Sequence, residues 1–146
     1  MQIGLYALAF VAGLLLTVQV GLNAVLRNAF GSPGLAALAN FLVGTVGLFA
    51  YVLITRAQWP SRTVLSGAPA WAWFGGLLGA FYVASSVVVG LRLGAAALLA
   101  LTVFGQLAAS LVVDNYGWLG FPQQPFTLAR LAGAGLLLVG VILIVR

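Results

Sequence analysis

Two rows of polar residues stand out in an otherwise apolar sequence, because each repeats at intervals of four. The rows are Gln19, Asn23 and Arg27, and Gln106, Ser110 and Asp114. Residues at i, i+4 and i+8 share one face of an α-helix. Carboxamides and hydroxyls both donate and accept hydrogen bonds. Each row therefore predicts a helix face that binds either a polar ligand or the polar groups of another helix.

The sequence has few residues that could bind a metal, catalyse a reaction or hold a phosphate. The chain has no His, Cys or Glu, and a single Asp cannot build a metal site. Ser85 and Ser110 have no general base to activate them. The glycines at 75, 76 and 79 lack the Lys-Ser/Thr pair of a phosphate-binding loop. We expect neither an enzyme nor a bound metal or cofactor.

Composition places the chain in a membrane. Hydrophobic residues make up 64% of it and charged residues 5%, with a mean hydropathy of +1.20. A soluble domain carries about a quarter charged residues, so lipid must be the solvent here. The net charge of +5 does not indicate nucleic-acid binding, because the six arginines lie singly at the ends of apolar runs, where cations anchor helices.

Five apolar runs have the length that crosses a bilayer, about 20 residues each. They cover residues 3–26, 34–54, 70–90, 94–113 and 128–145. Continuous rather than alternating hydrophobicity argues against a β-barrel. Ser32 and Pro33 read as the N-cap and first residue of the second helix. We predict an all-α integral membrane protein with a single transmembrane domain, residues 1–146, and its N- and C-termini on opposite sides.

The arginines are balanced between the two membrane surfaces. With five spans, the surface of the N-terminus (side A) receives Arg56, Arg62 and Arg130, and the other surface (side B) receives Arg27, Arg92 and Arg146. Orientation in the membrane follows an excess of Lys and Arg on one side, which is missing here. The sequence therefore predicts dual topology and an antiparallel homodimer, an inverted repeat of ten helices.

The tryptophans agree with this pairing, since all four fall on side A: Trp59, Trp71, Trp73 and Trp118. Interfacial aromatic residues normally line both surfaces, and an antiparallel pair would supply both from one sequence. The alternative explanation is that side A simply has the longer connections. Small residues also recur at helix-packing spacing, most densely from Gly75 to Ala84, and these stripes could face a partner or a neighbouring helix.

Polar residues at membrane depth supply the candidate substrate site. Gln19, Asn40 and Ser85 lie roughly 7 Å from the midplane toward side B, and inverting one copy brings them level with Gln106 and Ser110. The predicted substrate-binding residues are Gln19, Asn23, Asn40, Tyr82, Ser85, Phe104, Gln106 and Ser110. The alternative is that each polar group bonds only a neighbouring helix or a backbone carbonyl.

Asp114 is the only acidic residue, and two roles are open to it. A carboxylate in the membrane can couple transport to a proton or cation. Asp114 instead falls at the end of the fourth run, on the side of Arg56, Arg62 and Arg130. There a structural ion pair, or a turn that ends the helix at Asp114-Asn115, is the favoured interpretation.

Four strings of residues together resemble a known family. They are Gln19-Val-Gly-Leu-Asn23, Asn40-Phe41-Leu-Val-Gly44-Thr45, the segment from Gly75 to Ser86, and Gly105-Gln106-Leu-Ala-Ala-Ser110-Leu-Val-Val-Asp114 with Tyr116-Gly117. The sequence resembles the YdcZ-type half-size members of the drug/metabolite transporter superfamily. The resemblance implies a five-span, multi-pass protein of the inner (cytoplasmic) membrane, an exporter that pairs to mimic ten-span relatives. The chain departs from it at Asn40, where Ser is expected, and lacks the helix-one Glu of small multidrug exporters.

We therefore expect a small-molecule secondary transporter that works by alternating access as an antiparallel homodimer, with the bilayer, a substrate and a second copy as its partners. Three alternatives remain. The protein could be a dual-topology channel for a small ion, a membrane assembly subunit that transports nothing, or half of a heterodimer with an oppositely oriented paralogue.

Overall fold

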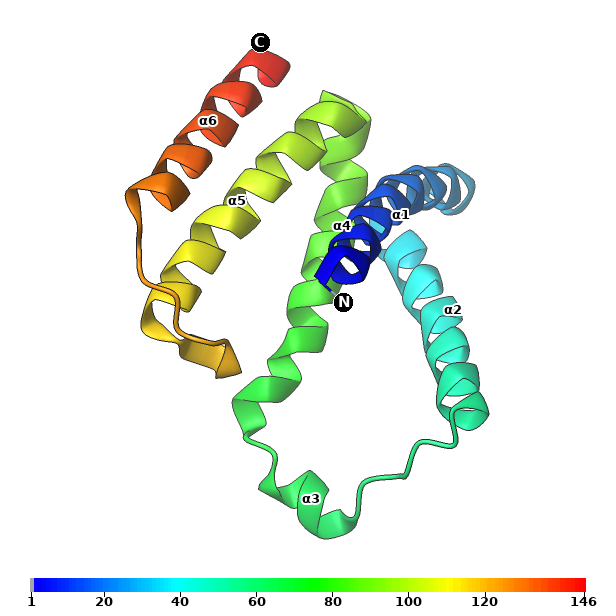
Figure 1. Ribbon diagram of the computed structural model, residues 1–146. Coiled ribbons are helices and arrows are strands. Elements are labelled where there is room, and N and C mark those ends of the chain that lie inside the picture. The colour runs from blue at the N-terminus through cyan, green and yellow to red at the C-terminus, as the bar shows by residue number, and fades with distance from the viewer. Residues whose placement is uncertain (1) are drawn as a thin grey trace. The chain divides into compact units, whose positions relative to one another are not determined.

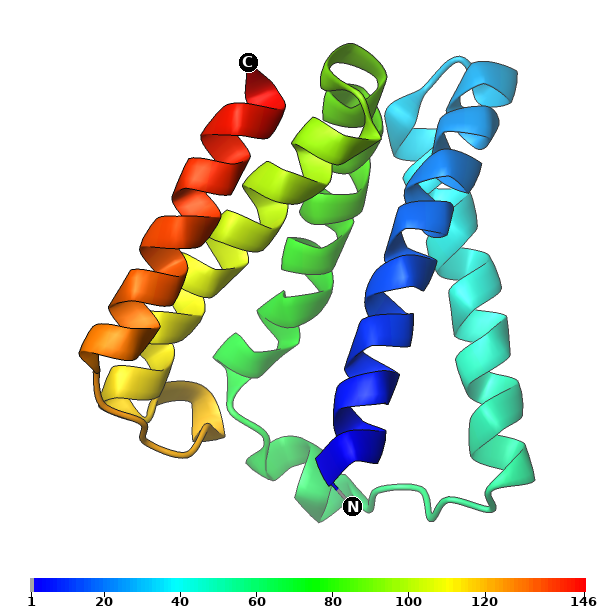
Figure 2. The same cartoon turned by 45° about the horizontal axis from the view of Figure 1, so that its top comes forward.

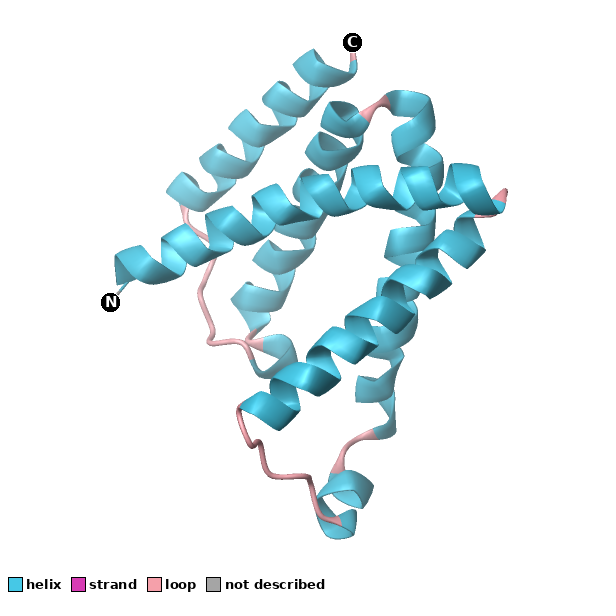
Figure 3. Cartoon of the chain, turned by 90° about the vertical axis from the view of Figure 1, so that its right-hand side faces the viewer, coloured by secondary structure: helices cyan, strands magenta, loops and turns pink. Residues whose placement is uncertain are grey.

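The structure is a computed structural model that describes residues 2–146, and within that range it contains helices and loops but no strand (Figure 3). In chain order the elements are α1 (Gln2–Phe30), α2 (Pro33–Ile54), α3 (Arg62–Gly67), the 3₁₀ turn η1 (Ala70–Phe74), α4 (Gly75–Leu93), α5 (Ala95–Tyr116), the 3₁₀ turn η2 (Trp118–Gly120) and α6 (Leu128–Val145). Five helical segments, with η1 and α4 taken as one, are long and apolar enough to cross a membrane. The prediction of five all-α spans is confirmed.

Some helix boundaries differ from the predicted ones, for a physical reason. The first helix runs to Phe30 instead of ending at residue 26, and α5 runs to Tyr116 instead of residue 113. Hydrophobicity marks the part of a helix inside hydrocarbon, whereas backbone hydrogen bonding continues past it. The short helix α3 was not predicted. Ser61 caps it by accepting a hydrogen bond from the Val64 amide at 3.4 Å.

The chain forms two compact units, one that ends at Val88 and one that covers Val89–Arg146. In the first unit, α1 and α2 form an antiparallel hairpin (Figure 2). Gly31 makes the turn with a φ of +69°, a conformation that favours glycine. The Ser32 hydroxyl then accepts a hydrogen bond from the Leu35 amide at 3.3 Å, and Pro33 opens α2. The predicted cap of α2 is confirmed.

The α1–α2 hairpin is closed at its turn and open at its other end, where the two helices diverge (Figure 3). Near the turn, Ala36 and Ala37 are buried, because methyl side chains let the helices approach closely. Val20 and Asn23 are the buried residues of α1. Most other large apolar side chains of the hairpin are exposed, as expected for a surface that faces lipid.

One close contact joins α4 to α2 within the first unit. A Cβ atom added at Gly79 would lie 3.6 Å from Cζ of the Phe41 ring. That distance is ordinary van der Waals contact for the added atom, so the space between Gly79 and the ring holds a methyl group but nothing larger. Among the glycines at 75, 76 and 79, Gly79 alone has such a neighbour.

Replacing Gly79 by Leu should therefore destabilise the protein by about 1–3 kcal/mol, since a larger side chain must displace the Phe41 ring. Gly79→Ala should be close to neutral, because its methyl group fits at the observed distance. Gly76→Leu is the matched control, since nothing lies within 4 Å of a Cβ at that position. Thermal unfolding in detergent measures all three. Equal losses for Gly76→Leu and Gly79→Leu would contradict the assigned contact.

The second unit contains the end of α4 and the antiparallel pair α5 and α6 (Figure 1). Leu111 of α5 and Val141 of α6 are buried. Gln106 and Ser110 of α5 are exposed in the single chain. Gly117 ends α5 in the left-handed conformation, with a φ of +63°, and its amide donates to the Asp114 carbonyl at 3.2 Å.

Candidate functional site

The open side of the α1–α2 hairpin contains a groove of about 340 Å³. Three elements of the first unit form it. Its lining consists of Gln19 from α1, Asn40, Phe41, Val43, Gly44, Thr45 and Leu48 from α2, and Val83 from α4. The groove thus combines two carboxamides and a hydroxyl with an apolar wall, the usual composition of a small-molecule site.

A second cavity, of about 380 Å³, lies nearer the turn of the hairpin. Its lining residues are Leu22, Asn23, Val25 and Leu26 from α1, and Ala39, Asn40 and Val43 from α2. Because Asn40 and Val43 line both cavities, we treat the two as sections of one α1–α2 groove. The three carboxamides of Gln19, Asn23 and Asn40 are therefore brought together.

Asn23 is the least satisfied polar residue of the groove. It is 2% exposed, and its carbonyl oxygen Oδ1 has no hydrogen-bond partner among residues 2–146. Leaving a buried acceptor unpaired costs about 1–3 kcal/mol. Such a group is satisfied by an ordered water, by another chain or by a ligand, so Asn23 is the residue of the groove where a ligand would gain most from donating a hydrogen bond.

Hydroxyl groups at membrane depth behave differently, because several are satisfied within their own helices. The Thr45 hydroxyl donates to the Phe41 carbonyl at 2.8 Å, and the Ser86 hydroxyl donates to the Val83 carbonyl at 2.8 Å. Thr17 and Thr102 make the same kind of contact. These hydroxyls therefore bond backbone carbonyls of their own helices, as the alternative explanation expected. The side-chain oxygen of Asn23 has no such bond.

The other predicted residues lie outside the linings of the two sections. Tyr82 and Ser85 are half-buried on α4, where Val83 is the residue that reaches the groove. Phe104 is half-buried on α5, and Gln106 and Ser110 are exposed there. These three belong to the second unit. Their role in substrate binding stays a prediction.

Phe41, Thr45 and Leu48 line the groove but were not predicted as site residues. Phe41 and Thr45 belong to the Asn40–Thr45 string that carries the family resemblance, so that string could have identified them as site residues. Nothing in the sequence identifies Leu48 and Val83, because an apolar residue that lines a groove cannot be told from one that faces lipid.

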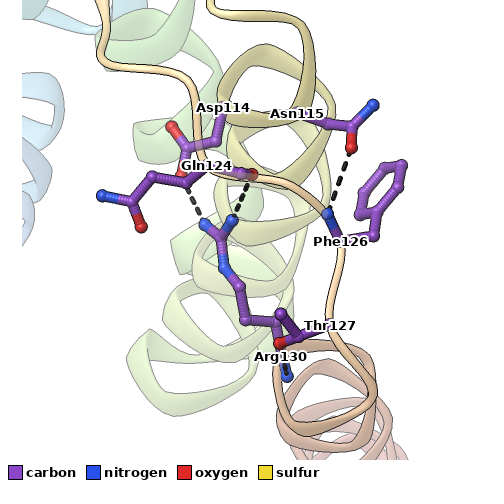
Figure 4. Close-up of polar contacts among 6 residues, drawn as sticks. All are labelled: Asp114, Asn115, Gln124, Phe126, Thr127 and Arg130. Atoms are coloured by element: carbon purple, nitrogen blue, oxygen red, sulfur yellow. Dashed lines mark hydrogen bonds and ion pairs between the residues drawn. The ribbon is translucent and has the colours of Figure 1, made fainter.

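Asp114 lies in a hydrogen-bonded network that joins α5 to α6 (Figure 4). Its carboxylate accepts from the guanidinium of Arg130 in an ion pair, with side chains 24% and 28% exposed. The second guanidinium nitrogen of Arg130 donates to the Gln124 carbonyl at 2.7 Å. The Gln124 amide in turn donates to the Asp114 carbonyl at 2.8 Å. Arg130, rather than Arg56 or Arg62, is thus the partner of the single acid.

Asn115 extends the same network along the connection. Its side-chain oxygen accepts from the Phe126 amide at 3.1 Å, and its carbonyl accepts from Nε2 of Gln123 at 3.0 Å (Figure 4 shows the first contact). Thr127 then caps α6 by accepting from the Arg130 amide at 3.2 Å. Asp114 and Asn115 therefore lie in the last turn of α5, which Gly117 ends, and their contacts position the start of α6.

Asp114→Asn is expected to destabilise the protein by about 1–3 kcal/mol, because it leaves the partly buried guanidinium of Arg130 without its counter-charge. Transport should change little, since the network lies outside the α1–α2 groove. Thr63→Val is the control, a near-isosteric loss of a polar side chain at an exposed residue outside the network that leaves the arginine balance unchanged. Thermal unfolding and flux are measured side by side. Loss of flux at unchanged stability would instead assign Asp114 a coupling role.

Five apolar helices long enough to cross a membrane, with a groove lined in part by carboxamides, are typical of a multi-pass membrane protein of a transporter-like class. Residues 4–143 match the family described as "Putative inner membrane exporter, YdcZ". The chain is also 30% identical, over 140 residues, to "Inner membrane protein YdcZ" of Escherichia coli (strain K12), covering 96% of this chain and 93% of that protein. The chain belongs to the YdcZ family of inner membrane proteins. No solved structure matches it.

Family membership confirms two of the predictions. The resemblance read from the four strings is correct, and the chain is a multi-pass protein of the inner membrane. The family is described as an exporter, which agrees with a transporter-like role rather than catalysis.

Proposed function

We propose that this protein is a small-molecule exporter that works by alternating access as an antiparallel homodimer, with the α1–α2 groove as its substrate site. The observation that carries the proposal is the gathering of Gln19, Asn23 and Asn40 in one groove at membrane depth. Polar groups there are costly unless they serve a ligand or a partner. The family description as an exporter supports the same activity.

The antiparallel pairing is supported by the surface of the single chain. Gln106 and Ser110 are exposed on α5, in a segment long and apolar enough to span the membrane. An exposed carboxamide facing lipid is unfavourable, so a second protein surface is expected to cover it. The balanced arginines and the four exposed tryptophans of side A point to a second copy in the opposite orientation.

Alternating access follows from that geometry. In an inverted pair, the two copies adopt different conformations, and exchanging them moves the opening of a central site from one surface to the other. The V-shaped α1–α2 hairpin supplies an element that can open and close, because its buried contacts concentrate near the turn. Gln19, Asn23 and Asn40 then supply polar contacts along the mostly apolar groove between the two helices.

Orientation is the first test, and the absence of native cysteine makes it simple. Asn28→Cys reports on side B and Gln58→Cys on side A, each as the only thiol of its variant. With a membrane-impermeant maleimide added to intact cells, each variant should label to about half. Complete labelling of one variant and none of the other would show a single orientation and end the homodimer proposal.

Flux measurements in liposomes distinguish an exporter from a channel, from a subunit that transports nothing and from half of a heterodimer. An exporter moves substrate slowly and saturably, since each molecule needs a conformational change. A dual-topology channel passes ions far faster, and an assembly subunit passes nothing. Purified protein without any partner should transport; a requirement for a paralogue would indicate the heterodimer.

A further inference from the structure

The groove contains no formal charge. The six arginines and the single aspartate are all absent from the linings of both sections. Asp114, the only carboxylate that could neutralise a cationic ligand, is paired with Arg130 in the second unit. A charged ligand entering the groove would therefore lose its hydration without gaining a counter-charge.

Arg27 is the arginine nearest to the groove along α1, one turn beyond Asn23 on the same face. Its guanidinium donates to the side-chain oxygen of Asn28 at 3.2 Å. It thus lies along the end of the helix and adds no charge to the linings. The positive charge of Arg27 also disfavours the approach of a cationic ligand from the C-terminal end of α1.

The carboxamides define what the polar part of a ligand must carry. Gln19 and Asn40 each offer a donor and an acceptor, so they are not selective between the two. In Asn23 the fully buried polar atom without a hydrogen-bond partner is the side-chain oxygen Oδ1, which can only accept from a donor. That oxygen is covered in this conformation, so a donor reaches it only when the side chains packed around Asn23 move apart.

From these observations we infer that the groove takes an uncharged amphipathic molecule whose polar end carries a hydroxyl or amide N–H, with that donor bonded to Oδ1 of Asn23. The apolar part of the molecule lies against Phe41, Leu22 and Leu48. The two sections, of about 340 and 380 Å³, match the size of small-molecule sites in general. The inference rests on the groove being the substrate site of the proposed exporter.

Binding of four matched probes tests the chemical class. The probes share one apolar part: 4-phenylbutanol, butylbenzene, the quaternary cation 4-phenylbutyl-trimethylammonium and the anion 4-phenylbutyrate. Affinity for the purified full-length protein is measured by calorimetry in detergent. The alcohol should bind most tightly, and butylbenzene about tenfold more weakly for want of one hydrogen bond. Tighter binding of the cation or the anion would overturn the inference.

Asn23→Leu tests the assigned acceptor, because Leu has nearly the shape of Asn without its polar atoms. The alcohol should lose about tenfold in affinity, while butylbenzene binds unchanged. The unliganded variant should also unfold at a temperature about 2–4 °C higher, since the unpaired buried acceptor is gone. Gln2→Leu is the control, a carboxamide on the same helix outside the groove. A lower unfolding temperature with unchanged alcohol affinity would mean that Asn23 is a packing residue.

Asn40→Asp provides a gain of specificity. A carboxylate at this half-buried position should raise the affinity of the quaternary cation at least tenfold and lower that of 4-phenylbutyrate. No change for either ion would place the binding site elsewhere. These outcomes are independent of transport: alcohol binding by a protein with one orientation would keep the ligand class and end the antiparallel proposal.

Discussion

Two variants, one with arginines removed from side B and one with arginines removed from side A, are each expected to lose transport when expressed alone. Transport should return when the two are expressed together. Arg27→Gln with Arg92→Gln leaves three arginines on side A and one on side B. Arg56→Gln with Arg62→Gln leaves one on side A and three on side B. Each variant then has the Lys/Arg excess that sets a single orientation, in opposite senses. An antiparallel pair can form only when both variants are present.

The loss should approach the background rate for each variant alone, and the restored flux should approach half of the wild-type flux or more. Arg27→Lys with Arg92→Lys is the matched control, because it keeps every charge and should keep both orientations. Single-cysteine labelling at Asn28 and Gln58 measures the orientation of each variant independently. Full transport by either variant alone, in one demonstrated orientation, would contradict the antiparallel mechanism. Arg130 is left unchanged throughout, since it is the partner of Asp114.

Removing two carboxamides of the groove should have the second largest effect. The double variant Gln19→Leu with Asn40→Leu is expected to lower flux about 10–100-fold, if each carboxamide supplies one hydrogen bond to the substrate worth about 0.5–1.5 kcal/mol. Stability should be unchanged or slightly higher, because apolar side chains at membrane depth are favourable. Flux in liposomes and thermal unfolding are measured on the same preparations.

Two further variants sharpen this result. Asn40→Ser retains one donor and one acceptor at the same position, so its flux should fall between those of wild type and Asn40→Leu. Thr17→Val is the matched control on α1, since the Thr17 hydroxyl is already bonded to the Gly13 carbonyl at 3.4 Å. Wild-type flux in the double variant would remove the groove as the substrate site. Equal loss in Thr17→Val would show a general effect on α1.

The structure also changes how the polar rows should be interpreted. Gln19 and Asn23 share one face of α1, as their spacing predicted, and both line the groove. Asp114, the last member of the second row, turns instead to Arg130 and holds the connection to α6. A regular spacing of four therefore identified a shared helix face in both rows, but it did not distinguish a ligand-binding residue from a structural one.

Local properties of the chain were enough to predict several features of this protein. The five spans follow from the cost of placing polar groups in hydrocarbon, which each segment of sequence expresses by itself. The cap at Ser32 and Pro33 likewise depends on adjacent residues. The family resemblance lay in short strings that could be read directly. The depth of Gln19 and Asn40 in the membrane, which comes from counting residues along a helix, stays a prediction.

Tertiary structure alone decided which of these residues meet. Whether Asn40 faces Gln19, and whether Ser86 bonds its own helix, depends on the rotation of each helix about its axis and on side-chain rotamers. Those are set by packing between helices, such as the contact of Phe41 with Gly79. Arg130 reaches Asp114 because the connection folds back on itself, whereas side assignment leaves three arginines equivalent. Hydropathy gives the depth of a polar group, and packing gives its partner.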